Sequence, residues 1–363
     1  MQDGAQRVGT LQGAEAGLMK DLRSKLFCLL AACALSLVGF TSSASAQGPY
    51  HVSAVWKIGG DSWWDYLAVD PVSKLLYVTH GDHVVVIDTS SGTVKADITG
   101  LKGTHGVAFD TSGKFGYISD GGANQVVVFD RKTNAIVTRV PAGMNPDGIV
   151  FEPVTQTVWA FNGRSKSATV IDDATHAVVA TVPLPGKPEF PVADGKGSVY
   201  DNIEDLSEIA HIDAKTHKVL ATWPIAPCEG PSGLAIDREH ARLFSVCDGK
   251  MAIVDANSGK MVATVPIGDG PDAARFDVKH HLAFSSNGEG TLTVVRENSP
   301  DSYSVIQTLP TKRGARTMAL DQSTGKIFVV TADFDPRPAA TPDHPHPRPS
   351  LVPGSFVVLE ISR

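Results

Sequence analysis

The sequence predicts an all-β protein, a seven-bladed β-propeller with four antiparallel strands in each blade. One stretch, GPSGLAIDREHARLFSVCDGKMAIVDANSGKMVATVPI at 230–267, contains four short apolar strands separated by polar turns, and the pattern recurs along the chain. The acidic residue that ends each first strand marks seven copies, spaced 40, 42, 42, 43, 40 and 44 residues apart: Asp70, Asp110, Glu152, Asp194, Asp237, Asp277 and Asp321. A period of about 40 to 45 residues with four strands per copy is the signature of a propeller blade.

The seven copies favour one closed unit at residues 50–363, although a chain of 363 residues would otherwise suggest about two domains. Blades bury their apolar faces only against one another, so the copies cannot fold separately. The stretch HVSAVWKI at 51–58 resembles a fourth strand with no blade before it, and FVVLEI at 356–361 resembles a third strand with no fourth after it. We therefore expect the N-terminal strand to complete the last blade and close the ring.

The region before the repeats predicts a signal peptide at residues 19–46. Three basic residues follow Met19, an apolar run of 15 residues covers 26–40, and Ala44-Ser45-Ala46 provides a cleavage site after Ala46. Residues 1–18 are expected to be untranslated or disordered, and an uncleaved N-terminal anchor is the alternative. No second long apolar run follows, so the sequence predicts a periplasmic or secreted protein without a membrane span after cleavage.

Four of the second strands carry a related tetrapeptide: Tyr77-Val78-Thr79-His80, Tyr117-Ile118-Ser119-Asp120, Phe244-Ser245-Val246-Cys247 and Phe284-Ser285-Ser286-Asn287. These segments resemble the Tyr-Val-Thr-Asn repeat of the YVTN, or YncE-like, seven-bladed propeller family, over roughly residues 50–363. The resemblance implies the fold and no particular activity, because propellers host many functions. The architecture is also similar to that of the lactonase-type propellers.

The candidate site comes from positions that differ between copies. The loop that enters the first strand and the loop between strands two and three open on the same face of a propeller. Five residues before the marker acids, the chain presents Asp65, His105, Asp147, Glu189, Ser232, Asp272 and Arg316. At the ends of the second strands it presents His80, Asp120, Asn162, Asn202, Cys247, Asn287 and Thr331. Structural positions in repeats should look alike, so this variety of polar residues predicts a functional channel mouth.

These residue types predict a metal site or an acid–base site, with a water-filled polar mouth as the alternative. Carboxylates and amide oxygens suit Ca²⁺ or Mg²⁺, and histidine would shift the preference toward a transition metal. The candidate metal ligands are Asp65, His105, Asp147, Asp272, Asn162, Asn202 and Asn287. In a hydrolase of lactonase type, Glu189 would be the general base and Arg316 would stabilise the oxyanion.

We rank a binding or scaffold protein of the cell envelope above that enzyme, with a small molecule, a glycan or a protein held at the channel face. The formal net charge of −7 and the lack of a basic cluster argue against nucleic acid as a partner. The sequence does not specify an oligomeric state.

Two further predictions concern a pair of cysteines and a proline-rich insertion. Cys228 and Cys247 would remain after cleavage, and the even count in an exported protein predicts a disulfide between them. A proline-rich insertion at 333–354, which contains His344 and His346, predicts a lid over the channel.

Overall fold

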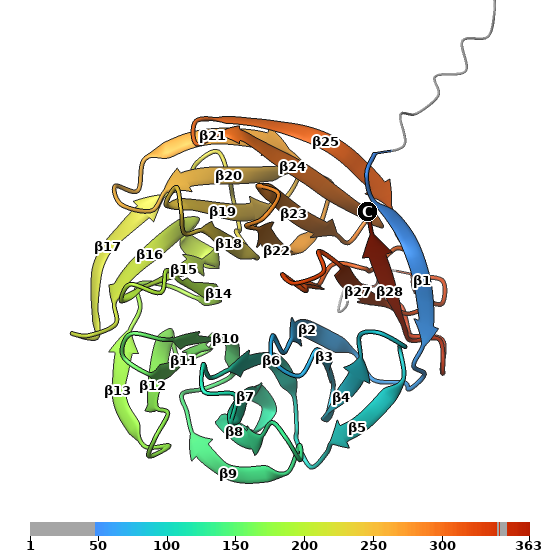
Figure 1. Ribbon diagram of the computed structural model, residues 1–363, viewed down its shortest axis with the longest axis horizontal. Helices are drawn as coiled ribbons and strands as arrows, with labels where there is room; N and C mark the ends of the chain where they lie inside the picture. The colour runs from blue at the N-terminus through green and yellow to red at the C-terminus, as the bar shows by residue number, and fades with distance from the viewer. Residues whose placement is uncertain (1–47, 340, 342–346) are drawn as a thin grey trace, which may run out of the picture. The chain divides into compact units, whose positions relative to one another are not determined.

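The computed structural model describes residues 48–339, 341 and 347–363, and these residues form a ring of seven four-stranded antiparallel sheets (Figure 1). The seven-bladed propeller predicted from the repeat is therefore confirmed. The expected signal peptide, residues 1–18, His344 and His346 lie outside the described residues. Within the described part of the chain, no helix is long and apolar enough to cross a membrane.

The strands follow the chain blade by blade, from the channel outward. The first four blades are β2 Trp64–Val69, β3 Leu75–His80, β4 His83–Asp88, β5 Val94–Ile98; β6 Thr104–Phe109, β7 Phe115–Asp120, β8 Gln125–Asp130, β9 Ile136–Pro141; β10 Pro146–Glu152, β11 Thr157–Asn162, β12 Ser167–Asp172, β13 Val178–Pro183; and β14 Pro188–Ala193, β15 Ser198–Ile203, β16 Glu208–Asp213, β17 Lys218–Pro224. The fifth and sixth are β18 Leu234–Asp237, β19 Arg242–Cys247, β20 Lys250–Asp255, β21 Met261–Pro266; and β22 Pro271–Asp277, β23 Leu282–Asn287, β24 Thr291–Ser299, β25 Ser302–Pro310. Two single-turn 3₁₀ helices, Gly121–Ala123 and Glu204–Leu206, connect second and third strands.

The seventh blade joins the two ends of the propeller. Its strands are β26 Met318–Leu320, β27 Ile327–Thr331 and β28 Val357–Ser362, and the fourth is β1 His51–Lys57, which pairs antiparallel with β28. Figure 1 shows β1 lying along β28 at the rim of the ring. The predicted closure is confirmed, and no gap separates the first blade from the last.

Apolar side chains fill the spaces between blades. Seven buried clusters each combine residues of two neighbouring blades; one of them packs Leu67 and Val78 of the first blade against Phe328 and Val330 of the seventh. The middle strands β3 and β11 are almost wholly buried, whereas the outer strands β1 and β17 alternate between exposed and half-buried residues. A strand covered on both faces is mostly apolar, and an edge strand alternates.

The marker acids lie on the face opposite the channel mouth, where they bind turn N–H groups and, in one place, an arginine. Arg131 is buried between the first two blades: its Nε donates to Asp70 at 3.0 Å and its NH1 donates to Asp110 at 2.8 Å. A second hydrogen bond joins the guanidinium to Asp70. Arg131 therefore links two adjacent blades through a buried ion triad.

Candidate functional site

The channel mouth brings the first ring of sequence-predicted residues together. Asp65, Asp147, Glu189, Asp272 and Arg316 line a cavity of about 600 Å³, with Ser232 on the same wall. Each of these residues stands at the start of the innermost strand of its blade or in the loop that enters it. The cavity is the entrance to the central channel, because innermost strands surround the axis of a propeller.

His105 lies between two of the carboxylates. Its Nδ1 is 2.6 Å from Asp65 Oδ2 and 3.7 Å from Asp147 Oδ1. Burial disfavours the imidazolium, but the hydrogen bond with Asp65 and the charge of Asp147 outweigh it and raise the pKa of His105 to about 9. One donor atom from each of the three residues falls within 4.8 Å of the others, so the set could hold a cation. A proton on His105 and a bound metal ion would compete for the same nitrogen.

Glu189 is largely buried and has a basic neighbour that sequence analysis did not assign to the site. Burial, followed by the charge of Asp147, raises the pKa of Glu189 to about 8. Lys187 Nζ lies 3.1 Å from Glu189 Oε2 and also forms an ion pair with Glu204. Beneath them, Asp201 is fully buried, and burial with the charge of Glu189 raises its pKa well above the usual range.

Asp272 and Arg316 form the opposite side of the mouth. Arg316 Nε is 3.1 Å from Asp272 Oδ2, and the side chain of Arg316 is 53% exposed while that of Asp272 is 11% exposed. Burial raises the pKa of Asp272 to about 6, although the Arg316 charge acts in the other direction. Burial likewise raises the pKa of Asp147 to about 7 despite the nearby His105. Several carboxylates of the mouth thus lack full compensation by cationic side chains.

Three side chains form a floor beneath the cavity. The rings of Tyr66 and Phe190 meet edge to face at a centroid distance of 4.8 Å, and the guanidinium of Arg275 lies 5.0 Å from the Phe190 centroid. Burial and the surrounding carboxylates raise the pKa of Tyr66 well above its usual value, so the phenol keeps its proton. A second cavity of about 310 Å³, lined by these three residues and by innermost strands, lies on the other side of the floor. The mouth is therefore a basin above this floor, with the channel continuing beneath it.

The polar residues at the ends of the second strands, the second ring of candidates, mainly stabilise the fold. Asn202 donates to the carbonyls of Ser232 and Gly233, and Asn287 donates to Thr291 and Thr293. Asn162 donates in the same way to Ser167 and Thr169, and all three asparagines are fully buried. Asn202 thereby links the fourth blade to the fifth, whereas Asn162 and Asn287 bond within their own blades, and none of the three lines the cavity at the mouth. Among the candidate metal ligands, the structure thus groups Asp65, His105 and Asp147 and separates the asparagines from them.

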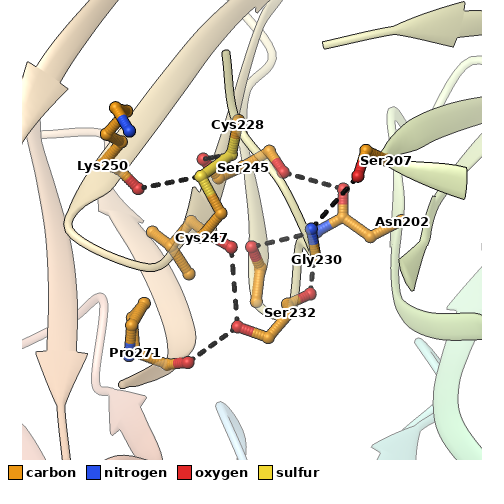
Figure 2. Close-up of a disulfide and its surroundings, with 11 residues drawn as sticks. Asn202, Ser207, Cys228, Gly230, Ser232, Ser245, Cys247, Lys250 and Pro271 are labelled. Carbon is orange, nitrogen blue, oxygen red and sulfur yellow. Dashed lines mark hydrogen bonds between the residues drawn. A yellow bond between two sulfur atoms is a disulfide. The ribbon is translucent and has the colours of Figure 1, made fainter. Parts of the chain in front are cut away.

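Further positions of the second ring also have structural partners. Asp120 accepts the backbone N–H groups of Lys102 and Gly103, and the ring of His80 stacks on Phe356 with centroids 4.3 Å apart. Cys247 forms the predicted disulfide with Cys228, with Cα atoms 5.6 Å apart (Figure 2). This bond fastens the loop that enters the fifth blade to the wall of the mouth, because Cys247 also lines the cavity.

An arginine-rich groove adjoins the acidic basin. The groove has a volume of about 300 Å³ and shares Gly270, Arg316 and Arg348 with the basin. Its other lining residues are Trp63, Trp64, Gly288, Arg313, Gly314, Phe334, Arg337 and Pro349. Among these described residues there is no carboxylate. The mouth therefore combines a basin rich in carboxylates with a groove rich in arginine and aromatic rings.

The blade-seven insertion supplies part of this groove. Phe334 bridges to Leu351, and Asp335 N–H donates to the Ser350 carbonyl, so the two ends of the insertion pair with each other. The Arg348 guanidinium lies 6.0 Å from the Trp63 ring centroid. The described ends of the insertion thus form a wall of the mouth. Whether the segment between them covers the channel as a lid stays a prediction.

Comparison with known proteins supports the fold and leaves the activity open. No protein-family model and no curated protein sequence matches the chain. A chain of Kuenenia stuttgartiensis hydrazine synthase matches with a TM-score of 0.67 and 15% identity, over 76% of this chain and 93% of that one. The WD40 repeats of RRP9 match with a TM-score of 0.72 and 10% identity, over 87% and 99%. Identities this low show a shared propeller architecture only.

The residues that sequence analysis missed lie in loops. Lys187 and Arg313 stand seven and eight residues before the marker acids Asp194 and Asp321, at positions that the comparison of copies did not include. The available signal for Lys187 was its place two residues before Glu189. Arg348 belongs to the insertion, where the repeat gives no register.

Proposed function

We propose that this protein is an exported binding protein that holds a small zwitterionic ligand in its channel mouth. The observation that carries the proposal is the junction of the acidic basin with the arginine and tryptophan groove, which share Arg316 and Arg348. An amine of the ligand would lie among Asp147, Glu189 and Asp272, where the carboxylates exceed the nearby cations. A carboxylate or phosphate of the same ligand would face the arginines of the groove.

The aromatic residues add a preference for a flat or cyclic ligand body. Trp63 is 44% exposed, and its ring stacks against Trp64 with centroids 5.9 Å apart. Exposed aromatic faces beside polar groups bind sugar or aromatic rings through apolar contact, and these side chains lose little conformational entropy on binding. Amino sugars that carry an acidic group and aromatic amino acids are therefore the ligand classes that fit best.

Location in the cell envelope is part of the proposal. It is supported by the predicted signal peptide at residues 19–46 and by the Cys228–Cys247 disulfide, since disulfides persist in oxidising compartments. Membership of the YVTN-type propellers is likewise proposed on the tetrapeptides of the second strands.

Isothermal titration of the mature protein with a ligand panel tests this function. The panel contains aromatic amino acids and acidic amino sugars. Diamines and dicarboxylates, which carry charges of one sign only, serve as comparisons. We expect micromolar binding of a zwitterion and a loss of about 10- to 100-fold in Arg316→Gln, because one charged hydrogen bond contributes about 1.5–3 kcal/mol. Lys132→Gln, an exposed change on the opposite face, should leave binding unaltered. Failure of every zwitterion to bind, or equal affinity in Arg316→Gln, would contradict the proposal.

A metal-dependent hydrolase of lactonase type is the second candidate, favoured by the grouping of Asp65, His105 and Asp147. These residues would hold a divalent cation that polarises a carbonyl, and Glu189, with its pKa near neutrality, would accept a proton from the attacking water. Glu189→Gln should abolish lactone hydrolysis while metal content stays unchanged. Full turnover in that variant would exclude this mechanism.

A further inference from the structure

A second group of histidines and carboxylates lies on the face opposite the channel mouth, between the fifth and sixth blades. Asp237 ends β18, His240 and His281 belong to the turns after β18 and β22, and Glu297 lies in β24. One donor atom from each of the four residues falls within 4.8 Å of the others. None of the four lines the cavity at the mouth, so the group is independent of the function proposed above.

The donor atoms converge on one point. His240 Nδ1 lies 2.7 Å from Asp237 Oδ2 and 3.3 Å from Glu297 Oε2, and His281 Nδ1 lies 3.5 Å from the same Glu297 oxygen. In a tetrahedral site with ligand bonds of about 2.0–2.1 Å, neighbouring donors stand roughly 3.3–3.4 Å apart. The observed separations lie on both sides of that value, so small side-chain movements would complete the tetrahedron.

The other polar atoms of the carboxylates are already bound, which orients the converging ones. Asp237 Oδ1 accepts the N–H of Glu239 at 2.9 Å, and Glu297 Oε1 accepts the hydroxyl of Tyr303 at 3.3 Å. Contacts of this kind around a metal site fix the direction of its ligands.

Burial and charge indicate that a cation belongs there. The Asp237 and Glu297 side chains are each only 1% exposed, whereas His240 and His281 are 28% and 41% exposed. Among the described residues, no lysine or arginine forms an ion pair with either carboxylate. Two buried carboxylates beneath two accessible imidazoles would be neutralised by one divalent ion.

The repeat strengthens this argument, because Glu297 occupies the position of Arg131. Arg131 N–H donates to the carbonyl before β7, and Glu297 N–H donates to the carbonyl before β23. Arg131 faces Asp70, the marker acid of the preceding blade, and Glu297 faces the equivalent marker acid, Asp237. The fifth and sixth blades therefore place a carboxylate where the first and second blades place the neutralising arginine.

We propose that Asp237, His240, His281 and Glu297 bind one first-row transition-metal dication, of which Zn²⁺ fits best, as a structural clip between the fifth and sixth blades. Imidazole nitrogen with carboxylate oxygen suits such ions, and four protein ligands leave no open coordination position. The site is structural because a catalytic zinc keeps a position for water or substrate.

The test uses the mature protein stripped with a chelator, desalted and titrated with Zn²⁺, with melting temperature and metal content as readouts. We expect about one ion at this site and a concentration-dependent rise in melting temperature. His281→Gln should weaken binding at least about tenfold and remove most of the rise. His280→Gln is the matched control, because His280 is the preceding residue and pairs with Asp277 at 2.7 Å outside the cluster. All variants are made in a His105→Gln background, so that metal bound at the mouth does not contribute.

Two further measurements make the outcome decisive. Co²⁺ in place of Zn²⁺ should give the intense visible absorption of a four-coordinate ion, and His281→Gln should lose that absorption. Glu297→Arg should abolish the response to zinc while keeping a melting temperature near that of the zinc-loaded protein, since it recreates the arginine arrangement of the first two blades. Absence of bound zinc in the His105→Gln parent, or an unchanged zinc response in His281→Gln, would overturn the proposal and leave a protonated His240 as the neutralising charge.

Discussion

Replacement of Arg131 by methionine should destabilise the propeller strongly. The Arg131, Asp70 and Asp110 side chains are 2%, 1% and 0% exposed, so Arg131→Met leaves two carboxylates buried without their cation. Removal of one partner from a buried ion pair costs about 3–5 kcal/mol. A domain of this size has an unfolding entropy of roughly 0.65 kcal/mol/K, so the melting temperature should fall by about 5–8 °C. Differential scanning calorimetry at pH 7 measures this change.

The stability lost in Arg131→Met should depend on pH. Burial opposes ionisation of Asp70, but the hydrogen bonds from Arg131 and from the N–H of Val72 hold its pKa below 3.8. A carboxyl with a depressed pKa contributes stability above its unfolded pKa, and this stability is lost as the pH falls through the folded value. The difference between the wild type and Arg131→Met should therefore be largest at pH 7 and should narrow near pH 3.

Two matched variants complete the experiment. Lys132→Met removes the same charge from the next, exposed position and should change the free energy of unfolding by less than about 0.5 kcal/mol. Asp70→Asn with Asp110→Asn and Arg131→Met removes all three charges and should recover most of the loss, because neutral triads are often as stable as charged ones. A fall of less than about 1 °C in Arg131→Met, or an equal fall at pH 3, would refute the reasoning.

The remaining predictions concern closure of the ring and the disulfide. Deletion of residues 48–57 removes β1 and exposes the edge of β28, so the melting temperature should fall by more than in Arg131→Met and size-exclusion chromatography should detect self-association; an unchanged melting temperature would contradict closure. Replacement of both Cys228 and Cys247 by serine should cost about 3 kcal/mol, since the bond closes a loop with a sequence separation of 19 residues. Thiol titration of the denatured, unreduced polypeptide of residues 48–363 should find no free thiol.

The fold could be predicted because every blade repeats the same four-strand pattern and must bury its apolar faces against its neighbours. The spacing from Asp70 to Asp321 counts the blades, and the mismatch between the two chain ends predicts the pairing of β1 with β28. The first ring of the mouth could be predicted for the same reason, since a fixed offset from each marker acid selects positions such as Asp65 and Asp272. Sequence position thus determined which residues face the channel.

The rest of the site depends on side-chain partners that the repeat does not specify. Asn202 and Asn287 occupy the same second-strand position as Cys247, which lines the cavity. Their amides instead bind neighbouring backbone carbonyls and hydroxyl groups. Arg348 reaches the basin from the insertion of the seventh blade, which no offset could align, and Lys187 stands two residues outside the chosen offset. The repeat aligns Glu297 with Arg131. The cluster around Glu297 could be recognised only from its distances to His240, which belongs to the fifth blade, and to His281, which belongs to a different turn of the sixth.

Closure of the ring by β1 also sets the order in which the molecule can assemble. Ser53 of β1 bonds to Glu360 of β28 across a separation of 307 residues. A chain that is synthesised from its N-terminus must keep β1 unpaired until nearly the whole polypeptide has been made. Six sheets can form in succession by local pairing, while the seventh waits for the last segment. During that interval the unpaired edge of β1 is the part of the molecule most open to pairing with another chain.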